Sequence, residues 1–130
     1  MIVIDASALV NVLLHRRLYA SIEKRMREAG RLAAPHLIDA EIGHALRRLL
    51  LRGEVRALTV RSILADLDAL LLQRYRHDLL LPRALELRDN ATVYDAIYIA
   101  LAEALAVPLV TQDRALGRVP NVRTSIEIIA

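Results

Sequence analysis

The chain has 130 residues, no cysteine and a formal net charge of +3, and 55% of its residues are hydrophobic. This length is typical of one domain, so we expect a single domain over residues 1–130 with a sizeable core. The absence of cysteine excludes disulfides and thiolate metal sites and fits a reducing compartment. We see no secretory signal and no apolar run long enough to span a bilayer, so we expect a cytoplasmic protein with no membrane partner.

The first half of the chain alternates between strand and helix patterns. A short β-branched run ends at Asp5 and is typical of a buried strand. The apolar residues after it recur at helical spacing, and Gly30 and Gly53 are stop signals for two helices. In chain order, we expect a strand at 2–4, helices at 8–14 and 18–30, a strand at 32–34 and a helix at 36–52.

The second half continues the alternation. Thr59 is the expected cap of a helix, and Thr92 with Asp95 resembles a capping box that opens a further one. The apolar stripe expected for the first of these helices is Val60, Ile63, Leu64, Leu67, Leu70 and Leu71. The elements expected after it are a strand near Tyr75, helices at 82–88 and 96–106, a strand at 108–111, a helical turn at 114–117 and a strand at 122–128.

Strands that alternate with helices predict an α/β fold, here a three-layer α/β/α sandwich around a parallel β-sheet. Ligand sites in such folds lie beyond the carboxyl ends of the strands. Two acids fall at that position, because Asp5 ends the first strand and Asp113 follows the strand at 108–111. Each has an ordinary structural alternative, a helix cap for Asp5 and an Asx-turn for Asp113.

Two more acids are candidates for the same site. Asp95 opens a helix that is apolar almost all round, where an unpaired charge is costly, although it could also be a cap. On the helix at 36–52, Glu41 and Asp39 lie at opposite margins of the apolar stripe, and periodicity does not choose between them. A cluster of carboxylates is self-repelling without a cation, and oxygen ligands of this kind suit Mg²⁺ or Mn²⁺.

Four segments resemble the signature of PIN-domain proteins in order and spacing. They are Ile4-Asp5-Ala6-Ser7, Ala40-Glu41, Tyr94-Asp95-Ala96-Ile97-Tyr98-Ile99-Ala100-Leu101-Ala102 and Val110-Thr111-Gln112-Asp113. More narrowly, the chain resembles the VapC-type toxins of type II toxin–antitoxin modules, over residues 1–129. This resemblance implies the three-layer fold and a Mg²⁺-dependent endoribonuclease in which Mn²⁺ is expected to substitute.

The resemblance also implies roles for individual residues. The acids that match the family's catalytic metal ligands are Asp5, Glu41, Asp95 and Asp113. This match selects Glu41 over Asp39, and Ser7 and Thr111 match hydroxyls that support the metal site. Such an enzyme hydrolyses RNA phosphodiester bonds with a metal-activated water, which leaves 5′-phosphate and 3′-hydroxyl ends.

Two side chains are candidates for RNA contact. Arg48 follows Glu41 by seven residues and lies on the same side of the helix, and His44 shares that side. The alternative for both is a solvated surface. The net charge is too small to decide between these roles.

The resemblance further implies a cognate antitoxin, which would pack over an apolar groove, and a homodimer. The apolar residues compatible with such a groove are Leu9, Val10, Leu13 and Leu14 in the first helix and Leu49, Leu50 and Leu51 in the third. Ordinary core packing is the alternative explanation.

Two other functions are possible interpretations of an acidic site in a small α/β domain. A signalling receiver domain needs a lysine near its acidic pocket, but Lys24 is the only lysine and falls in an amphipathic helix. A PIN-like module that binds RNA or a protein without cutting is the remaining alternative, against which the intact set of acids argues.

Overall fold

The computed structural model covers residues 1–130 and contains five β-strands and six α-helices. The strands are β1 (Ile2–Ile4), β2 (Leu32–Pro35), β3 (Leu72–Tyr75), β4 (Leu109–Thr111) and β5 (Ile126–Ile128). The helices are α1 (Ala6–Leu13), α2 (Tyr19–Ala29), α3 (Leu37–Leu51), α4 (Ala57–Ala69), α5 (Leu81–Glu86) and α6 (Val93–Leu105), with a 3₁₀-helix η1 (Leu116–Arg118). None of the helices is long and apolar enough to cross a membrane.

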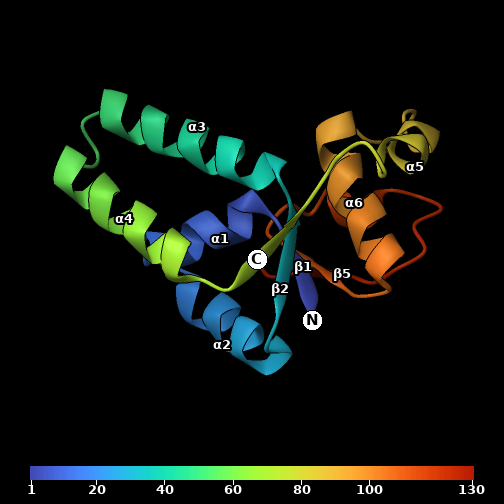
Figure 1. Ribbon diagram of the computed structural model, residues 1–130, viewed down its shortest axis with the longest axis horizontal. Coiled ribbons are helices and arrows are strands. Elements are labelled where there is room, and N and C mark those ends of the chain that lie inside the picture. The colour runs from blue at the N-terminus through green and yellow to red at the C-terminus, as the bar shows by residue number, and fades with distance from the viewer.

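The five strands form one sheet in the order β3-β2-β1-β4-β5, and every neighbouring pair is parallel. Helices α1 to α4 lie on one side of the sheet and α5 and α6 on the other (Figure 1). The expected three-layer α/β/α sandwich around a parallel sheet is therefore confirmed. It follows from the strand–helix alternation, because parallel neighbours need a crossover and helices supply it.

The sheet reverses its direction of growth at β1. From β1 the chain adds β2 and then β3 on one side, and it returns through α6 to place β4 on the other side of β1. In the β1–β4 ladder, Ile4 is opposite Val110. The carboxyl ends of these two strands form the switch point at which open α/β sheets bind ligands.

The core lies on both faces of the central strands. All three residues of β1 are fully buried, and α6 contributes an unbroken buried run from Ala96 to Ala102. The helix that the sequence predicts to be apolar almost all round is thus a central helix of the fold. Glu103, which directly follows this run, is held by the guanidinium of Arg83 on α5 at 2.7 and 3.2 Å, so its charge is compensated where the helix leaves the core.

Helix α3 begins without a capping side chain of its own. Its N-cap residue, His36, makes no side-chain cap, and the backbone N–H of Leu37 donates instead to Nε2 of His77 at 2.9 Å. A residue from the segment after β3 thus satisfies one of the donors left free at a helix start. This contact fixes the first turn of the helix that carries Glu41.

Several expected boundaries were wrong. Helix α4 begins at Ala57, with Arg56 as its N-cap, so Thr59 lies inside the helix and does not cap it. In the expected stripe, Leu64 is 47% exposed and Leu71 is 93% exposed, because α4 ends at Ala69 and packs through one narrow face. The last strand spans Ile126–Ile128 rather than 122–128, since its partner β4 offers only three residues for pairing.

The other boundaries differ by smaller amounts. Helix α6 begins at Val93, three residues earlier than expected, because the Thr92 side chain accepts the Asp95 N–H and caps it there. The helical turn expected at 114–117 is the 3₁₀-helix Leu116–Arg118.

Three helix ends adopt positive φ angles. Gly30 and Gly53 do so at φ +72° and +68°, which glycine adopts without a Cβ penalty. Helix α6 ends instead at Ala106, with φ 54° and ψ 44°, in the left-handed region that costs an L-residue about 1–2 kcal/mol.

We expect Ala106→Gly to raise the free energy of unfolding by about 1 kcal/mol, because glycine removes the Cβ penalty at this helix end. Urea unfolding followed by circular dichroism measures the change. Ala65→Gly, at an exposed position inside α4, is the matched control and is expected to lower stability by about 1 kcal/mol. Destabilisation by both substitutions would contradict the role given to the left-handed cap.

Candidate functional site

Asp5 lies at the switch point and is the most constrained acid of the chain. Its Oδ1 accepts the Ser7 hydroxyl at 2.7 Å and the Ala8 backbone N–H at 3.0 Å, and its Oδ2 accepts the Thr111 hydroxyl. Burial raises the pKa of Asp5, the three hydrogen bonds oppose that shift, and the charge of Asp113 adds to it. The side chain therefore caps α1 and keeps one lone pair free on Oδ2.

Glu41 reaches the same site from the second turn of α3. Its Oε1 accepts the hydroxyl of Tyr98 at 2.7 Å, and Tyr98 is itself buried on α6. Partial burial raises the pKa of Glu41, the bond from Tyr98 lowers it, and the charges of Asp5 and Asp95 raise it further. One oxygen of Glu41 is thus fixed across the sheet edge, while the other has no protein donor.

Asp95 and Asp113 complete the group. Asp95 is partly buried in the first turn of α6, where desolvation and the charge of Asp113 raise its pKa against an opposing hydrogen bond with Thr92. Asp113 is exposed, and its Oδ1 accepts the Ala115 N–H at 2.8 Å, which is the expected Asx-turn. Its own N–H donates to Oγ1 of Thr111 at 2.9 Å, so Thr111 links Asp113 to Asp5.

None of these four acids forms an ion pair, although the chain carries 18 lysines and arginines. The rival on α3, Asp39, is engaged elsewhere: it accepts both guanidinium bonds of Arg74 on β3, at 2.6 and 2.8 Å. The structure thus brings Glu41, and not Asp39, beside the other acids. Their charges are left to repel one another.

The donor set suits a hard divalent cation, because every side chain in it offers carboxylate or hydroxyl oxygen. In the present arrangement, no three His, Asp or Glu side chains stand close enough to enclose an ion directly. Mg²⁺ commonly takes only one or two carboxylates and keeps several waters, so this spacing is compatible with it. Lone pairs left free on Asp5, Glu41, Asp95 and Asp113 are available to an ion or to its waters.

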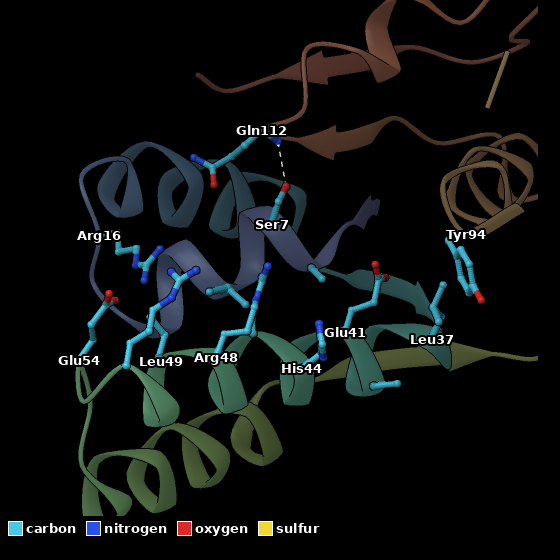
Figure 2. Close-up of a pocket in the computed structure, with 15 residues that line it drawn as sticks. Ser7, Arg16, Leu37, Glu41, His44, Arg48, Leu49, Glu54, Tyr94 and Gln112 are labelled. Carbon is cyan, nitrogen blue, oxygen red and sulfur yellow. Dashed lines mark hydrogen bonds between the residues drawn. The ribbon is translucent and has the colours of Figure 1, made fainter. Parts of the chain in front are cut away.

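A groove of about 970 Å³ opens beside the acids, between α1 and α3. Glu41, His44 and Arg48 follow one another along α3 into it, and Ser7 and Gln112 line the opposite side (Figure 2). The shared side expected for Glu41, His44 and Arg48 is therefore observed. The groove is lined by both apolar and charged residues.

The apolar groove expected from the sequence is only partly present. Leu9 and Leu13 are core residues, and Leu50 and Leu51 are exposed but do not line the groove. Only Val10 and Leu49 of the expected set line it. The first helix lies directly on the sheet, and this position buries most of its leucines.

Three side chains near the site were not expected from the sequence. Tyr98 orients Glu41, and the available signal was its position one turn after Asp95 in an otherwise apolar helix. Asn11, buried in α1, donates from Nδ2 to Oε1 of Gln112 at 3.4 Å, while its own Oδ1 has no partner. The N–H of Gln112 donates to Ser7 at 3.3 Å, so this chain of contacts reaches Asp5.

Comparison with known proteins gives one consistent family. Residues 2–122 match the family described as PIN domain. A protein named Ribonuclease VapC1 from Mycobacterium tuberculosis is 40% identical over 131 residues, which cover 98% of this chain and 96% of that protein. Ribonuclease VapC9 from the same organism is 39% identical over 129 residues, covering 99% and 98%.

Solved structures agree with this assignment. PAE2754 from Pyrobaculum aerophilum superimposes with a TM-score of 0.70 at 30% identity, covering 98% of this chain and 83% of that one. A structure described as VapBC2 from Rickettsia felis bound to a promoter DNA fragment gives a TM-score of 0.70 at 16% identity and covers both chains fully. The second likeness bears on the fold alone.

The raised pKa of Asp95 predicts a pH-dependent gain in stability for Asp95→Asn. A raised folded-state pKa means that stability is full below the unfolded value near 3.8 and is lost as the pH rises through the folded pKa. Asparagine does not ionise and keeps that stability. In chelator, we therefore expect the variant to melt at a higher temperature than the wild type at pH 7 and at the same temperature below about pH 4.

Thermal unfolding between pH 4 and pH 8 measures this difference. Asp66→Asn, at an exposed aspartate of α4 without an ion pair, is the control and should not change the melting temperature. A lower melting temperature for Asp95→Asn at pH 7 would show that the Asp95 charge is compensated in the folded state.

The Tyr98 hydroxyl lowers the pKa of Glu41, so we expect Tyr98→Phe to raise that pKa further. The phenyl ring keeps the packing of α6 and removes only the hydrogen bond. Carboxyl carbon NMR during a pH titration of the metal-free protein reads the value directly, with Tyr19→Phe on α2 as the control. An unchanged pKa would mean that the bond from Tyr98 to Glu41 is not maintained in solution.

Proposed function

The chain belongs to the PIN-domain family, and on this premise we propose that it is a divalent-metal-dependent endoribonuclease, the toxin component of a VapBC-type module. One observation carries the proposal: Asp5, Glu41, Asp95 and Asp113 gather at the switch point without a single cationic partner. The pKa values of Asp5, Glu41 and Asp95 are raised, which means that the folded chain disfavours their negative charges. A bound cation would compensate these charges. The relatives named ribonucleases support RNA as the substrate.

The four acids are the residues we propose to hold the metal, with Asp5 and Asp95 as the first candidates for direct ligands. Mg²⁺ is the ion we favour, with Mn²⁺ as a substitute. When bound there, the ion supplies a water of lowered pKa and neutralises charge on phosphoryl oxygens. The residues of the chain prepare this chemistry by holding their oxygens in place.

Two of the four acids are fixed in orientation by hydrogen bonds. The bonds from Ser7, Ala8 and Thr111 fix the carboxylate plane of Asp5, and the bond from Tyr98 fixes Glu41. Such preorganised groups do not have to reorient as charge develops in the transition state.

The proposed reaction is a simple hydrolysis. A water oxygen bonds to phosphorus, the bond from phosphorus to the 3′ oxygen breaks, and the 3′ oxygen takes up a proton. The ribose 2′-hydroxyl has no part in this exchange. The products therefore carry 5′-phosphate and 3′-hydroxyl ends, in contrast to the 2′,3′-cyclic phosphate left by a ribose attack.

We further propose two protein partners, a cognate antitoxin and a second copy of the chain. Structures similar in fold are described as a VapBC assembly and as a toxin–antitoxin complex. Two groups of exposed apolar side chains are suited to such contacts. One is formed by Leu51 and Leu58 around the α3–α4 turn, and the other by Leu79, Leu81 and Leu85 around α5.

We expect the purified protein to cut cellular RNA in Mg²⁺, to stop when the ion is chelated, and to leave 5′-phosphate and 3′-hydroxyl ends. Asp95→Asn should lower the cleavage rate at least about 100-fold, since the loss of even a supporting group at a metal site costs 10–100-fold. Gel electrophoresis with mapping of the fragment ends measures both. Asp39→Asn, which breaks an ion pair outside the acid group, should cut as the wild type does.

Metal binding can be measured separately from RNA cleavage, through the melting temperature. Mg²⁺ should raise the melting temperature of the wild type more than that of Asp95→Asn, because only an ion bound to the folded chain stabilises it. Cyclic phosphate ends would overturn the hydrolytic scheme. If several RNA pools stay uncut in Mg²⁺ and in Mn²⁺, a non-catalytic RNA- or protein-binding module becomes the better description.

A further inference from the structure

The groove beside the acids differs in chemistry between its two ends. Tyr94 and Leu37 line one end, past Glu41, whereas Arg16, Arg48 and Glu54 line the other (Figure 2). Arg52 also lines the groove. Glu41 lies between the two ends, so anything that occupies the whole groove passes the acids.

Tyr94 is placed by the same helix that positions two residues of the proposed active site. It directly precedes Asp95, and Tyr98 follows it by four residues on the same face of α6. Tyr98 donates to Glu41, so Tyr94 lies one turn beyond that bond, toward the start of the helix. Its side chain is 64% exposed, and its hydroxyl makes no hydrogen bond within the chain.

Packing within the chain does not account for the exposed ring of Tyr94. The chain has only four aromatic residues among Phe, Trp and Tyr, and Tyr94 is the one that lines the groove. Its ring does not pack against another aromatic ring. A flat apolar face that is open to the groove is the surface on which an unpaired nucleobase stacks.

The arginine end offers a different interaction. Arg16, Arg48 and Arg52 form no ion pair, although the carboxylate of Glu54 lines the same end. Together with His44 they surround this part of the groove with donors and positive charge, which Glu54 offsets only in part. Unpaired guanidinium groups of this kind bind phosphate oxygens.

We propose that Tyr94 is a specificity-determining residue of the groove: its ring stacks on one unpaired base beside the cut, while the arginine end holds backbone phosphates on the other side of Glu41. This inference rests on the proposed ribonuclease function and adds the residue that selects an unpaired base. A base in a duplex is already stacked and paired, so Tyr94 discriminates against duplex RNA. The arginine end contributes affinity without reading the sequence.

The test measures RNA binding by fluorescence anisotropy, with every variant in an Asp95→Asn background so that the RNA stays intact. The probes are a labelled 12-nucleotide single strand of mixed sequence and the same strand annealed to its complement. We expect the single strand to bind more tightly than the duplex. Tyr94→Ala should weaken single-strand binding about tenfold, and Tyr94→Phe should retain it, because stacking needs the ring and not the hydroxyl.

The salt dependence of RNA binding distinguishes the contribution of the arginine end from that of Tyr94. Arg48→Ala should reduce the slope of log affinity against log salt by about 0.7, whereas Tyr94→Ala should leave that slope unchanged. The controls are Tyr19→Ala on α2 and Arg61→Ala on α4, which lie outside the groove and should bind as the parent does.

The outcomes separate this inference from the proposed function. If the wild type cuts RNA but Tyr94→Ala binds the single strand as well as its parent, or the duplex binds equally well, the inference is wrong and the function stands. If the wild type neither cuts nor binds any RNA, both fail together. Loss of binding with Tyr94→Phe as well as Tyr94→Ala would assign the effect to the hydroxyl and overturn the stacking role.

Discussion

The pairing of β1 with β4 at the switch point is the constraint on which the site depends. It brings Thr111 to Asp5 across 106 positions of sequence, and the hydroxyl then joins Asp5 to the backbone of Asp113. Ser7 and Ala8 complete the set of donors from α1. A shift in this register would move Thr111 to the other face of the sheet and separate the two acids, because side chains alternate along a strand. The fold and the site therefore rest on the same ladder.

The electrostatics of the acids contrast with those of the rest of the chain. Elsewhere, carboxylates near the core are compensated: Glu103 is bound by Arg83, and Glu127 on β5 is bound by Arg25 on α2 at 2.7 and 2.9 Å. The pKa values of Glu103 and Glu127 are accordingly lowered, whereas those of Asp5, Glu41 and Asp95 are raised. A chain with ample arginine thus leaves one group of acids uncompensated, which is the pattern expected where function overrides stability.

The sequence predicted those parts of the fold and site that depend on local pattern. Asp5 and Asp113 could be placed at one sheet edge because each follows a short buried run, and parallel strands end together. Periodicity could not choose between Glu41 and Asp39, because the deciding partner of Asp39 is Arg74, on a strand 35 residues away. The contact between Tyr98 and Glu41 could not be predicted from local pattern either, since it joins α6 to α3 across the sheet edge. Leu64 and Leu71 carried the right spacing and still proved exposed, because spacing does not reveal where the packing partner ends.

Helix α6 links the packing of the core to the geometry of the site. Its first turn is fixed by Thr92, its middle is buried against the central strands, and Asp95, Tyr98 and Tyr94 all project from its first two turns. A displacement of the helix start would therefore change an acid, the support of a second acid and the ring at the groove end together. Such coupling explains why the buried run of α6 matters beyond its one direct contact with the site, the hydrogen bond from Tyr98 to Glu41: packing of the run against the sheet fixes the position of the whole helix. Positional precision at the groove thus derives from the packing of the core, and the loops contribute chiefly through Asp113 and Gln112.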